Sequence, residues 1–218
     1  MNLKEAVLGL LYPPKCPFCV CILDRDSDGL CDRCQRELPW TGEGEVRENI
    51  EFCDLCLSPL WYRGRAVEGV HRYKFRGGQI HAKLFGELMA QCLHDRWEGT
   101  ADLVTWVPLS KKRLRERGYD QARLLAQRMA ERLELPVRPT LEKTRNTTEQ
   151  SSLTEEAARR ANVKGVYRAL EGCDVEGKHV LLVDDVTTSG ATLSECAACL
   201  CMAGAASVTA ITLARAGK

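Results

Sequence analysis

The sequence lacks several features that would assign it to a class of proteins at once. Its formal net charge is only +1 over 218 residues, so overall charge neither favours nor excludes nucleic acid as a ligand, and local patches must decide. The most apolar early segment, residues 7–12, is too short to cross a membrane, and it lacks the order of charged, apolar and small residues typical of a secretion signal. We therefore expect a soluble, cytoplasmic protein with no membrane insertion.

Cysteine, in contrast, is abundant. The chain has 12, and its first sixty residues contain three Cys-x-x-Cys pairs. A disulfide framework is typical of small secreted proteins, and a chain of this length does not need one. The first two pairs are close enough in sequence for four thiolates to surround a zinc ion tetrahedrally. We predict a closed, structural zinc site with these ligands: Cys16, Cys19, Cys31 and Cys34.

The third pair, Cys53 and Cys56, has no fourth pair after it to complete a second metal site. Three interpretations stay open. The pair is an orphan, or it shares the first site by displacing another pair, or it is completed by Cys21 and a histidine. We favour the orphan interpretation.

From residue 63 onward, strand-like and helix-like segments alternate, which is typical of a parallel α/β sheet flanked by helices. An amphipathic helix is expected over residues 79–93, and its apolar face is expected to hold Ile80, Leu84, Leu88 and Met89. Strands are expected over residues 66–75, 101–109 and 207–213. The chain is thus predicted to divide into a cysteine-rich zinc module, residues 1–62, and an α/β domain, residues 63–218.

One stretch, residues 180–193, carries the strongest chemical signal. Its apolar start predicts a buried parallel strand that stops at Asp185, and residues 191–203 predict a helix. Adjacent carboxylates, Asp184 and Asp185, would be costly at a buried strand end without a function. Short hydroxyl side chains and a glycine follow just before the helix, where backbone N–H groups bind phosphate well. The stretch therefore predicts a cradle for a sugar phosphate.

Polar and basic segments lie around this cradle in the sequence. Basic residues are frequent over residues 110–128, directly after a predicted strand, where open α/β sheets bind their ligands. Lys74 and Arg76 precede a glycine pair and could contact a substrate phosphate, although a solvated turn fits them as well. Residues 143–168 have almost no large apolar side chains over about their first twenty positions, which indicates a lid or a disordered segment. The candidate contact residues of a lid are Arg145, Gln150, Arg159 and Asn162.

The stretch VLLVDDVTTSGATL resembles the phosphoribosyl pyrophosphate (PRPP) signature of type I phosphoribosyltransferases. Together with RERGYDQA at residues 115–122, the polar spacing before GVYR and the cysteine pairs, it makes the whole chain similar to the ComF family. These are phosphoribosyltransferase-like proteins linked to DNA uptake in competent bacteria. The resemblance implies an α/β phosphoribosyltransferase-like fold behind a small zinc module.

The resemblance also implies roles for single residues. Asp184 and Asp185, the catalytic pair, would hold the ribose hydroxyls of PRPP, which binds with Mg²⁺. Leu109, Ser110 and Lys111 occupy the turn that holds pyrophosphate. The 5′-phosphate would be held by the following loop: Thr187, Thr188, Ser189, Gly190, Ala191 and Thr192.

Two functions are consistent with these features. The first is a phosphoribosyltransferase, in which catalysis is mainly electrostatic and positional and needs no dedicated nucleophile. The alternative is a non-catalytic competence protein that binds single-stranded DNA and other competence proteins, with a regulatory PRPP-type pocket. Tyr119 within the basic segment favours DNA only weakly, because one aromatic side chain does not make a stacking platform. No segment identifies an acceptor base.

Overall fold

The computed structural model describes residues 13–24, 27, 29–42, 50–75, 77–145 and 163–217. At its centre lies a parallel sheet in which β1, β7, β6 and β3 follow one another, and β2 also pairs with β7. The strands have these bounds: β1 Leu55–Leu57, β2 Leu60–Trp61, β3 Leu103–Trp106, β6 His179–Thr187 and β7 Ser207–Arg215. The expected parallel α/β sheet is confirmed.

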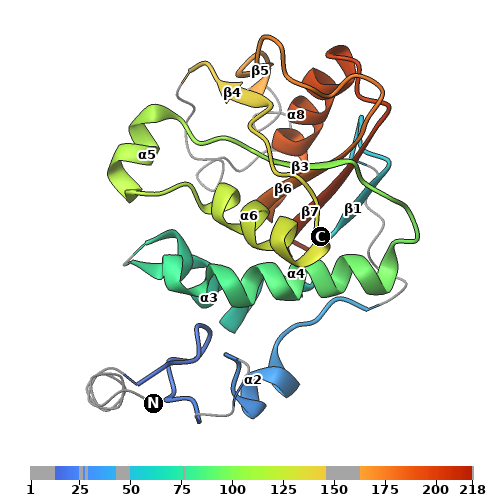
Figure 1. The fold of residues 1–218 in the computed structure, drawn as a ribbon. Helices are drawn as coiled ribbons and strands as arrows, with labels where there is room; N and C mark the ends of the chain where they lie inside the picture. The colour runs from blue at the N-terminus through green and yellow to red at the C-terminus, as the bar shows by residue number, and fades with distance from the viewer. Residues whose placement is uncertain are drawn as a thin grey trace, which may run out of the picture.

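Helices cover both faces of this sheet (Figure 1). The helices α4 and α6 pack on one face, with α3 beside them, and α8 packs on the other. Successive residues of β6 alternate between the two layers, so that Leu181 and Val183 join the α4 side and Leu182 joins the α8 side. The helices have these bounds: α3 Arg65–Lys74, α4 Ala82–Arg96, α6 Gln121–Leu133 and α8 Ala191–Met202.

Shorter elements complete the described chain. The antiparallel pair of β4 and β5 lies at the end of the molecule near α8 and across from α5 (Figure 1). The N-terminal cysteine region holds α2, and a 3₁₀ turn, η1, precedes α4. These elements have the following bounds: α2 Asp32–Glu37, η1 Gly78–His81, α5 Lys111–Arg117, β4 Leu141–Lys143 and β5 Tyr167–Ala169.

The strand expected over residues 66–75 was wrong, because this segment forms the helix α3. Its buried positions, Ala66, Gly69, Val70 and Tyr73, recur every three or four residues, which is the period of a helix and not of a strand. Tyr73 is fully buried and its ring packs edge-on against Phe85 of α4. Tertiary packing on α4 therefore fixes this segment as a helix.

The helix expected over residues 79–93 is present as η1 followed by α4, but its apolar face differs from the expected one. Met89 is buried as expected, but Ile80 is 77% exposed, and Phe85 and Leu93 are buried in the core instead. Leu84 and Leu88 only pack against the edge of that core. The buried stripe is rotated because α4 presents its small residues to α6: a Cβ on Gly86 would lie 2.5 Å from Cβ of Arg128.

The strand β6 continues two residues past its expected end at Asp185, because β7 continues beside it. Val186 pairs with Ala214, and Thr187 pairs with Arg215. Both carboxylates consequently lie within a regular strand, where neighbouring side chains point to opposite faces. Asp185 is thus directed to the layer of α3, and Asp184 to the layer of α8.

The cysteine region packs on the helical layer through Phe18, which is fully buried. The Phe18 ring lies 5.3 Å from the Phe85 ring of α4, measured between centroids. On α3 it covers Gly69, where a Cβ would lie 2.5 Å from the ring. Arg72 donates two hydrogen bonds of 2.9 Å to the carbonyl oxygens of Pro17 and Phe18. A glycine on α3 therefore allows the close approach of the two parts.

Two strands on the N-terminal side of residue 62, β1 and β2, belong to the central sheet through their pairing with β7. The third cysteine pair lies in and just before β1, with Cys56 buried and Cys53 packed against the α8 side of the core. The sequence predicted that the zinc module extends to residue 62. Because β1 and β2 belong to the central sheet, we propose that the module ends before β1.

Candidate active site

The candidate site is a cavity of about 410 Å³ at the carboxyl ends of β3 and β6. Parallel α/β sheets bind ligands at this edge, because the loops that follow neighbouring strands meet there. The signature contributes Asp184, Asp185, Thr188 and Thr192, and the chain after β3 contributes Pro108 and Leu109. Among the described residues, four cationic side chains also line the cavity: Lys74, Arg113, Arg117 and Lys143.

Asp185 forms an ion pair with Lys74, whose Nζ lies 2.9 Å from Oδ1 of the carboxylate. Asp185 is only 8% exposed, and Lys74 is the last residue of α3. Two residues more than 100 positions apart in the sequence therefore meet in the cavity. The packing of α3 on the sheet face to which Asp185 points brings them together.

Asp184 lies on the other side of β6, and its Oδ1 accepts a hydrogen bond of 2.8 Å from the Asp185 backbone N–H. Burial raises the pKa of Asp184 to about 8, and the negative charge of Asp185 acts in the same direction. Burial and the neighbouring charge therefore favour the protonated form of Asp184 in the ligand-free site. A bound cation would favour release of the proton.

The loop between β6 and α8 has the form expected of an anion site. Gly190, at the N-cap of α8, has φ of 75°, and a Cβ there would lie 2.9 Å from Ile50. Thr187 Oγ1 and Ser189 Oγ are buried, and neither has a hydrogen-bond partner in the part of the chain that the structure describes. A buried hydroxyl without a partner costs free energy, which a ligand oxygen would recover.

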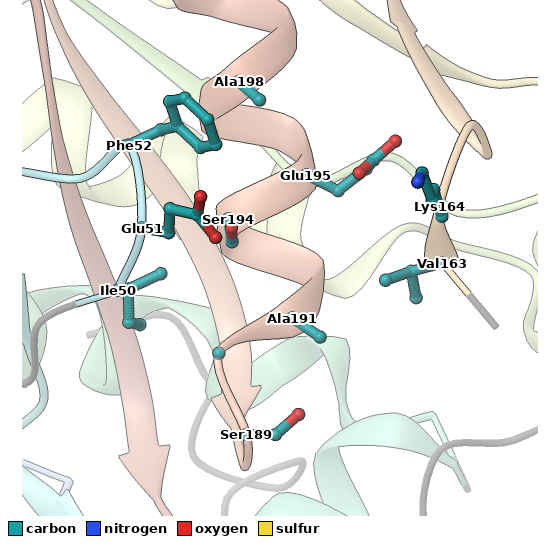
Figure 2. A pocket seen from close by; sticks show the side chains of 11 residues that line it. Ile50, Glu51, Phe52, Val163, Lys164, Ser189, Ala191, Ser194, Glu195 and Ala198 are labelled. Atoms are coloured by element: carbon teal, nitrogen blue, oxygen red, sulfur yellow. The ribbon is translucent and has the colours of Figure 1, made fainter. Parts of the chain in front are cut away.

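Five of the six residues predicted to hold the 5′-phosphate are divided between two cavities, and the buried Thr187 lines neither of them. Thr188 and Thr192 line the main cavity, whereas Ser189, Gly190 and Ala191 line a second one of about 400 Å³ on the outer side of α8. Figure 2 shows this second cavity between the chain at residues 50–52 and the chain at residues 163–164. Glu195 accepts a hydrogen bond of 2.5 Å from the Gly165 backbone N–H across it.

The turn predicted to hold pyrophosphate is partly occupied by the protein itself. The Ser110 hydroxyl is buried and accepts a hydrogen bond from the Arg113 backbone N–H as the N-cap of α5. The Leu109 N–H donates to the carboxylate of Asp120, which also caps α6. Burial raises the pKa of Asp120 above its usual range. Lys111 is exposed and faces a third cavity.

This third cavity, of about 480 Å³, lies between α5 and the β4–β5 pair. In the part of the chain that the structure describes, one acidic side chain lines it, Glu142, and this residue pairs with Arg168. Among the lid candidates, Arg145 donates a hydrogen bond of 2.7 Å to the Lys164 carbonyl oxygen, and Gln150, Arg159 and Asn162 lie outside the described residues. The basic residues of this cavity are Lys111, Lys112, Arg115, Lys143, Arg145 and Arg168.

Lys143 lines both the main and the third cavity, and sequence reasoning missed it. Burial lowers the pKa of its ammonium group, and the positive charge of Arg113 lowers it further. Its Nζ lies 5.2 Å from the centre of the Tyr167 ring. Crowded cations of this kind favour an anionic ligand between the two cavities. The signal in the sequence was weak, because Lys143 lies at the start of a polar segment expected to be a lid.

The four predicted cysteine ligands lie together: their sulfur atoms are all within 4.8 Å of one another. Cys19 Sγ is 3.5 Å from Cys31 Sγ, close to the separation of about 3.8 Å that tetrahedral thiolates around zinc would have. The Cys34 backbone N–H donates to Cys31 Sγ, and Arg65 of α3 donates to Cys34 Sγ at 3.7 Å. Such N–H donors stabilise thiolates, so the four sulfurs are suited to hold a metal ion.

The sequence left open whether three further cysteines, Cys21, Cys53 and Cys56, bind a metal ion. Cys21 Sγ lies 3.3 Å from Cys19 Sγ, but Cys21 is exposed and outside the group of four. Cys53 and Cys56 belong to no group of three or more possible metal ligands within the ranges that the structure describes. The orphan interpretation of that pair stays a prediction.

In the described ranges, no helix is both long enough and apolar enough to span a bilayer.

Comparisons with known proteins agree with the geometry. Residues 120–218 match the family model of the phosphoribosyl transferase domain. The chain is 31% identical to the DNA utilization protein YhgH of Escherichia coli (strain K12), covering 94% of this chain and 99% of that protein. It is 28% identical to competence protein F of Haemophilus influenzae, covering 93% and 97% of the two chains.

A solved structure, the glutamine PRPP amidotransferase from B. subtilis, is 27% identical to this chain with a TM-score of 0.45. The match covers 65% of this chain and 30% of that one. The matches to the two curated relatives, in contrast, cover more than nine-tenths of this chain.

Proposed function

The chain belongs to the ComF family, and from this premise we propose that it binds PRPP or ribose 5-phosphate, together with Mg²⁺, in the cavity at the ends of β3 and β6. The observation that carries the proposal is the pair Asp184 and Asp185 at the carboxyl end of β6, facing cationic side chains across the cavity. Carboxylates suit ribose hydroxyls, and the cations suit the phosphates at both ends of the sugar.

In this proposal the chain's residues bind and orient a sugar phosphate. Asp184 and Asp185 accept hydrogen bonds from the ribose hydroxyls, and the first turn of α8 with Thr188 and Thr192 holds the 5′-phosphate. Lys111 and Lys143 line the adjoining third cavity, and this proposal assigns them to the pyrophosphate. A bound Mg²⁺ would supply positive charge to the departing pyrophosphate. Transfer to a nitrogen base would then depend on electrostatic stabilisation of an oxocarbenium-like ribose, and the fixed carboxylates supply it.

The test is isothermal titration calorimetry with PRPP and with ribose 5-phosphate, each with and without Mg²⁺. We expect binding of both, with PRPP affinity dependent on Mg²⁺. The double variant Asp184→Asn with Asp185→Asn is expected to lose at least about 100-fold in affinity, since each carboxylate makes charged hydrogen bonds of about 1.5–3 kcal/mol. Absent binding by the wild type, or equal binding by the double variant, would contradict the proposal.

For the cysteine cluster, we propose a structural zinc ion. Four thiolates with no open position are the donor set of structural zinc sites, and softer thiolate donors exclude magnesium or calcium there. A cytoplasmic location and partners among other competence proteins also stay predictions, which the names of the relatives support only by association.

Single-stranded DNA binding is a second candidate function, and the third cavity favours it. Its basic side chains extend from the main cavity along α5 and β4, so that a strand with one nucleotide near the cradle could follow them. We expect the affinity for an oligonucleotide to fall linearly with salt on a double logarithmic plot. Replacing Lys112 and Arg115 by Ala should make the slope shallower by about 0.7 for each lost phosphate contact. A salt-independent affinity would rule out this function.

A further inference from the structure

Lys74 is well placed to do more than neutralise Asp185. Its Nζ carries three N–H donors, and the ion pair at 2.9 Å uses one of them. Gln121 of α6 donates through Nε2 to the Lys74 carbonyl oxygen, and the Tyr119 hydroxyl donates to the carbonyl oxygen of Tyr73. These two hydrogen bonds anchor the backbone at the end of α3 to the start of α6.

The side from which Lys74 enters indicates what it would bind. Asp185 points to the α3 side of the sheet, whereas the loop proposed for the 5′-phosphate lies at the start of α8, on the opposite side. A sugar held between the two carboxylates would have its 5′-phosphate near α8. Its other substituent, the pyrophosphate, would then lie nearer to α3 and Lys74. The described acidic side chains that line the cavity are Asp184 and Asp185, and the phosphate oxygens of a ligand would be suitable further acceptors for Lys74.

The helix α3 that carries Lys74 also contacts the cysteine module along its length. At its start Arg65 donates to Cys34 Sγ, and it forms an ion pair of 3.2 Å with Glu37 of α2. In the middle, Gly69 lies under the Phe18 ring. Near its end, Arg72 donates to the carbonyl oxygens of Pro17 and Phe18, which lie between the cysteines of the first pair. One helix thus connects the sulfur cluster to the carboxylates of the cavity.

We propose that Lys74 binds a pyrophosphate oxygen of the substrate, and that the cysteine module sets the position of Lys74 by holding α3. The inference rests on the proposed sugar-phosphate site and assigns it a residue outside the segment that matches the phosphoribosyl transferase domain, residues 120–218. Metal binding by the cysteines is then coupled to the affinity of the cavity for pyrophosphate. Lys74 acts directly, and Arg72 is a positioning residue that acts through it.

The direct test compares PRPP with ribose 5-phosphate by calorimetry, because only PRPP has the group that Lys74 would bind. Lys74→Met is expected to weaken PRPP binding about 10- to 100-fold, the loss of one charged hydrogen bond. Ribose 5-phosphate affinity should stay within about twofold on the same scale. Lys74→Arg should recover part of the PRPP affinity, and Lys83→Met, on the exposed face of α4, should bind both ligands like the wild type.

The outcomes separate this inference from the proposed function. If the wild type binds neither ligand, the proposed function itself fails. If the wild type binds PRPP and Lys74→Met binds it equally well, only the role of Lys74 fails. An equal loss for both ligands would show that Lys74 supports the cavity and does not bind pyrophosphate.

The coupling through α3 has its own matched pair of variants. Arg72→Met removes the two bonds to the cysteine module, whereas Glu68→Gln removes only the charge of the exposed partner of Arg72 on the same helix. Native mass spectrometry would first verify that both variants keep their zinc. We then expect Arg72→Met to lower the affinity for PRPP relative to that for ribose 5-phosphate several-fold, and Glu68→Gln to leave this ratio unchanged. Chelation of the metal should lower the same ratio. An unchanged ratio in both Arg72→Met and the metal-free protein would overturn the coupling.

Discussion

Cys34→Ser is expected to abolish stoichiometric metal binding and to unfold the cysteine module. Cys34 is fully buried, and its sulfur is one of the four within 4.8 Å of one another. Structural zinc sites of this kind contribute about 10–16 kcal/mol of apparent binding free energy in small peptides at neutral pH, and that energy is available for folding. Serine offers no thiolate, and the remaining three sulfurs would leave an open position.

Native mass spectrometry should find one zinc ion on the wild type and none on Cys34→Ser. The matched control is Cys21→Ser, because Cys21 is exposed and lies next to Cys19 but outside the group of four. It should keep the metal. Two zinc ions on the wild type would instead show that Cys53 and Cys56 are ligands, and zinc loss from Cys21→Ser would show that the fifth thiol belongs to the site.

The loss should also reach the α/β domain, because Phe18 and Leu38 of the module lie in the same buried cluster as α3 and α4. We expect the thermal unfolding midpoint to fall by well over about 5 °C, since each kcal/mol of stability corresponds to about 2–4 °C for a chain of this size. A variant without zinc but with an unchanged midpoint would show that the module folds independently of the domain.

The sequence was informative where chemistry is local. The cysteine pairs and residues 180–193 could be predicted because the ligand groups of each site are contiguous or closely spaced, so that a single turn or loop brings them together. The same holds for α8, whose start is determined by Gly190 and whose length is confirmed within one residue of the expected end.

The features that were missed depend on contacts between distant segments. Lys74 and Asp185 lie in different segments, and only the packing of α3 on the sheet joins them. Residues 66–75, which were expected to be a strand, form a short segment without a clear apolar period. Their helical form follows from the burial of Tyr73 and from the close contact between Gly69 and Phe18. Likewise, the place of β1 in the sheet depends on its pairing with β7 at the other end of the chain. No local pattern contains that information.

Asp184→Asn is expected to make the protein more stable while weakening its proposed ligand binding. The carboxyl of Asp184 has a model-peptide pKa of 3.8, and burial together with the charge of Asp185 raises it to about 8 in the folded protein. Folding therefore binds a proton between these two pH values. The stability of the wild type should fall as pH rises from about 4 through about 8, because the folded state must then ionise a buried carboxyl.

Asparagine removes this ionisation and can still accept the hydrogen bond from the Asp185 N–H. We expect a gain of a few kcal/mol at pH 8, in the direction set by the raised pKa, and almost none near pH 4. Thermal unfolding of both proteins at pH 4.5, 6 and 8 would measure it, with Asp174→Asn as the control, since the Asp174 side chain is 81% exposed. Parallel stability curves for wild type and Asp184→Asn would contradict the raised pKa. A gain in stability combined with at least about a tenfold loss in Mg²⁺-dependent PRPP affinity would instead show that the buried carboxylate serves binding at a cost to folding. The physical reason is that two adjacent buried acids are unfavourable until a ligand neutralises their charge.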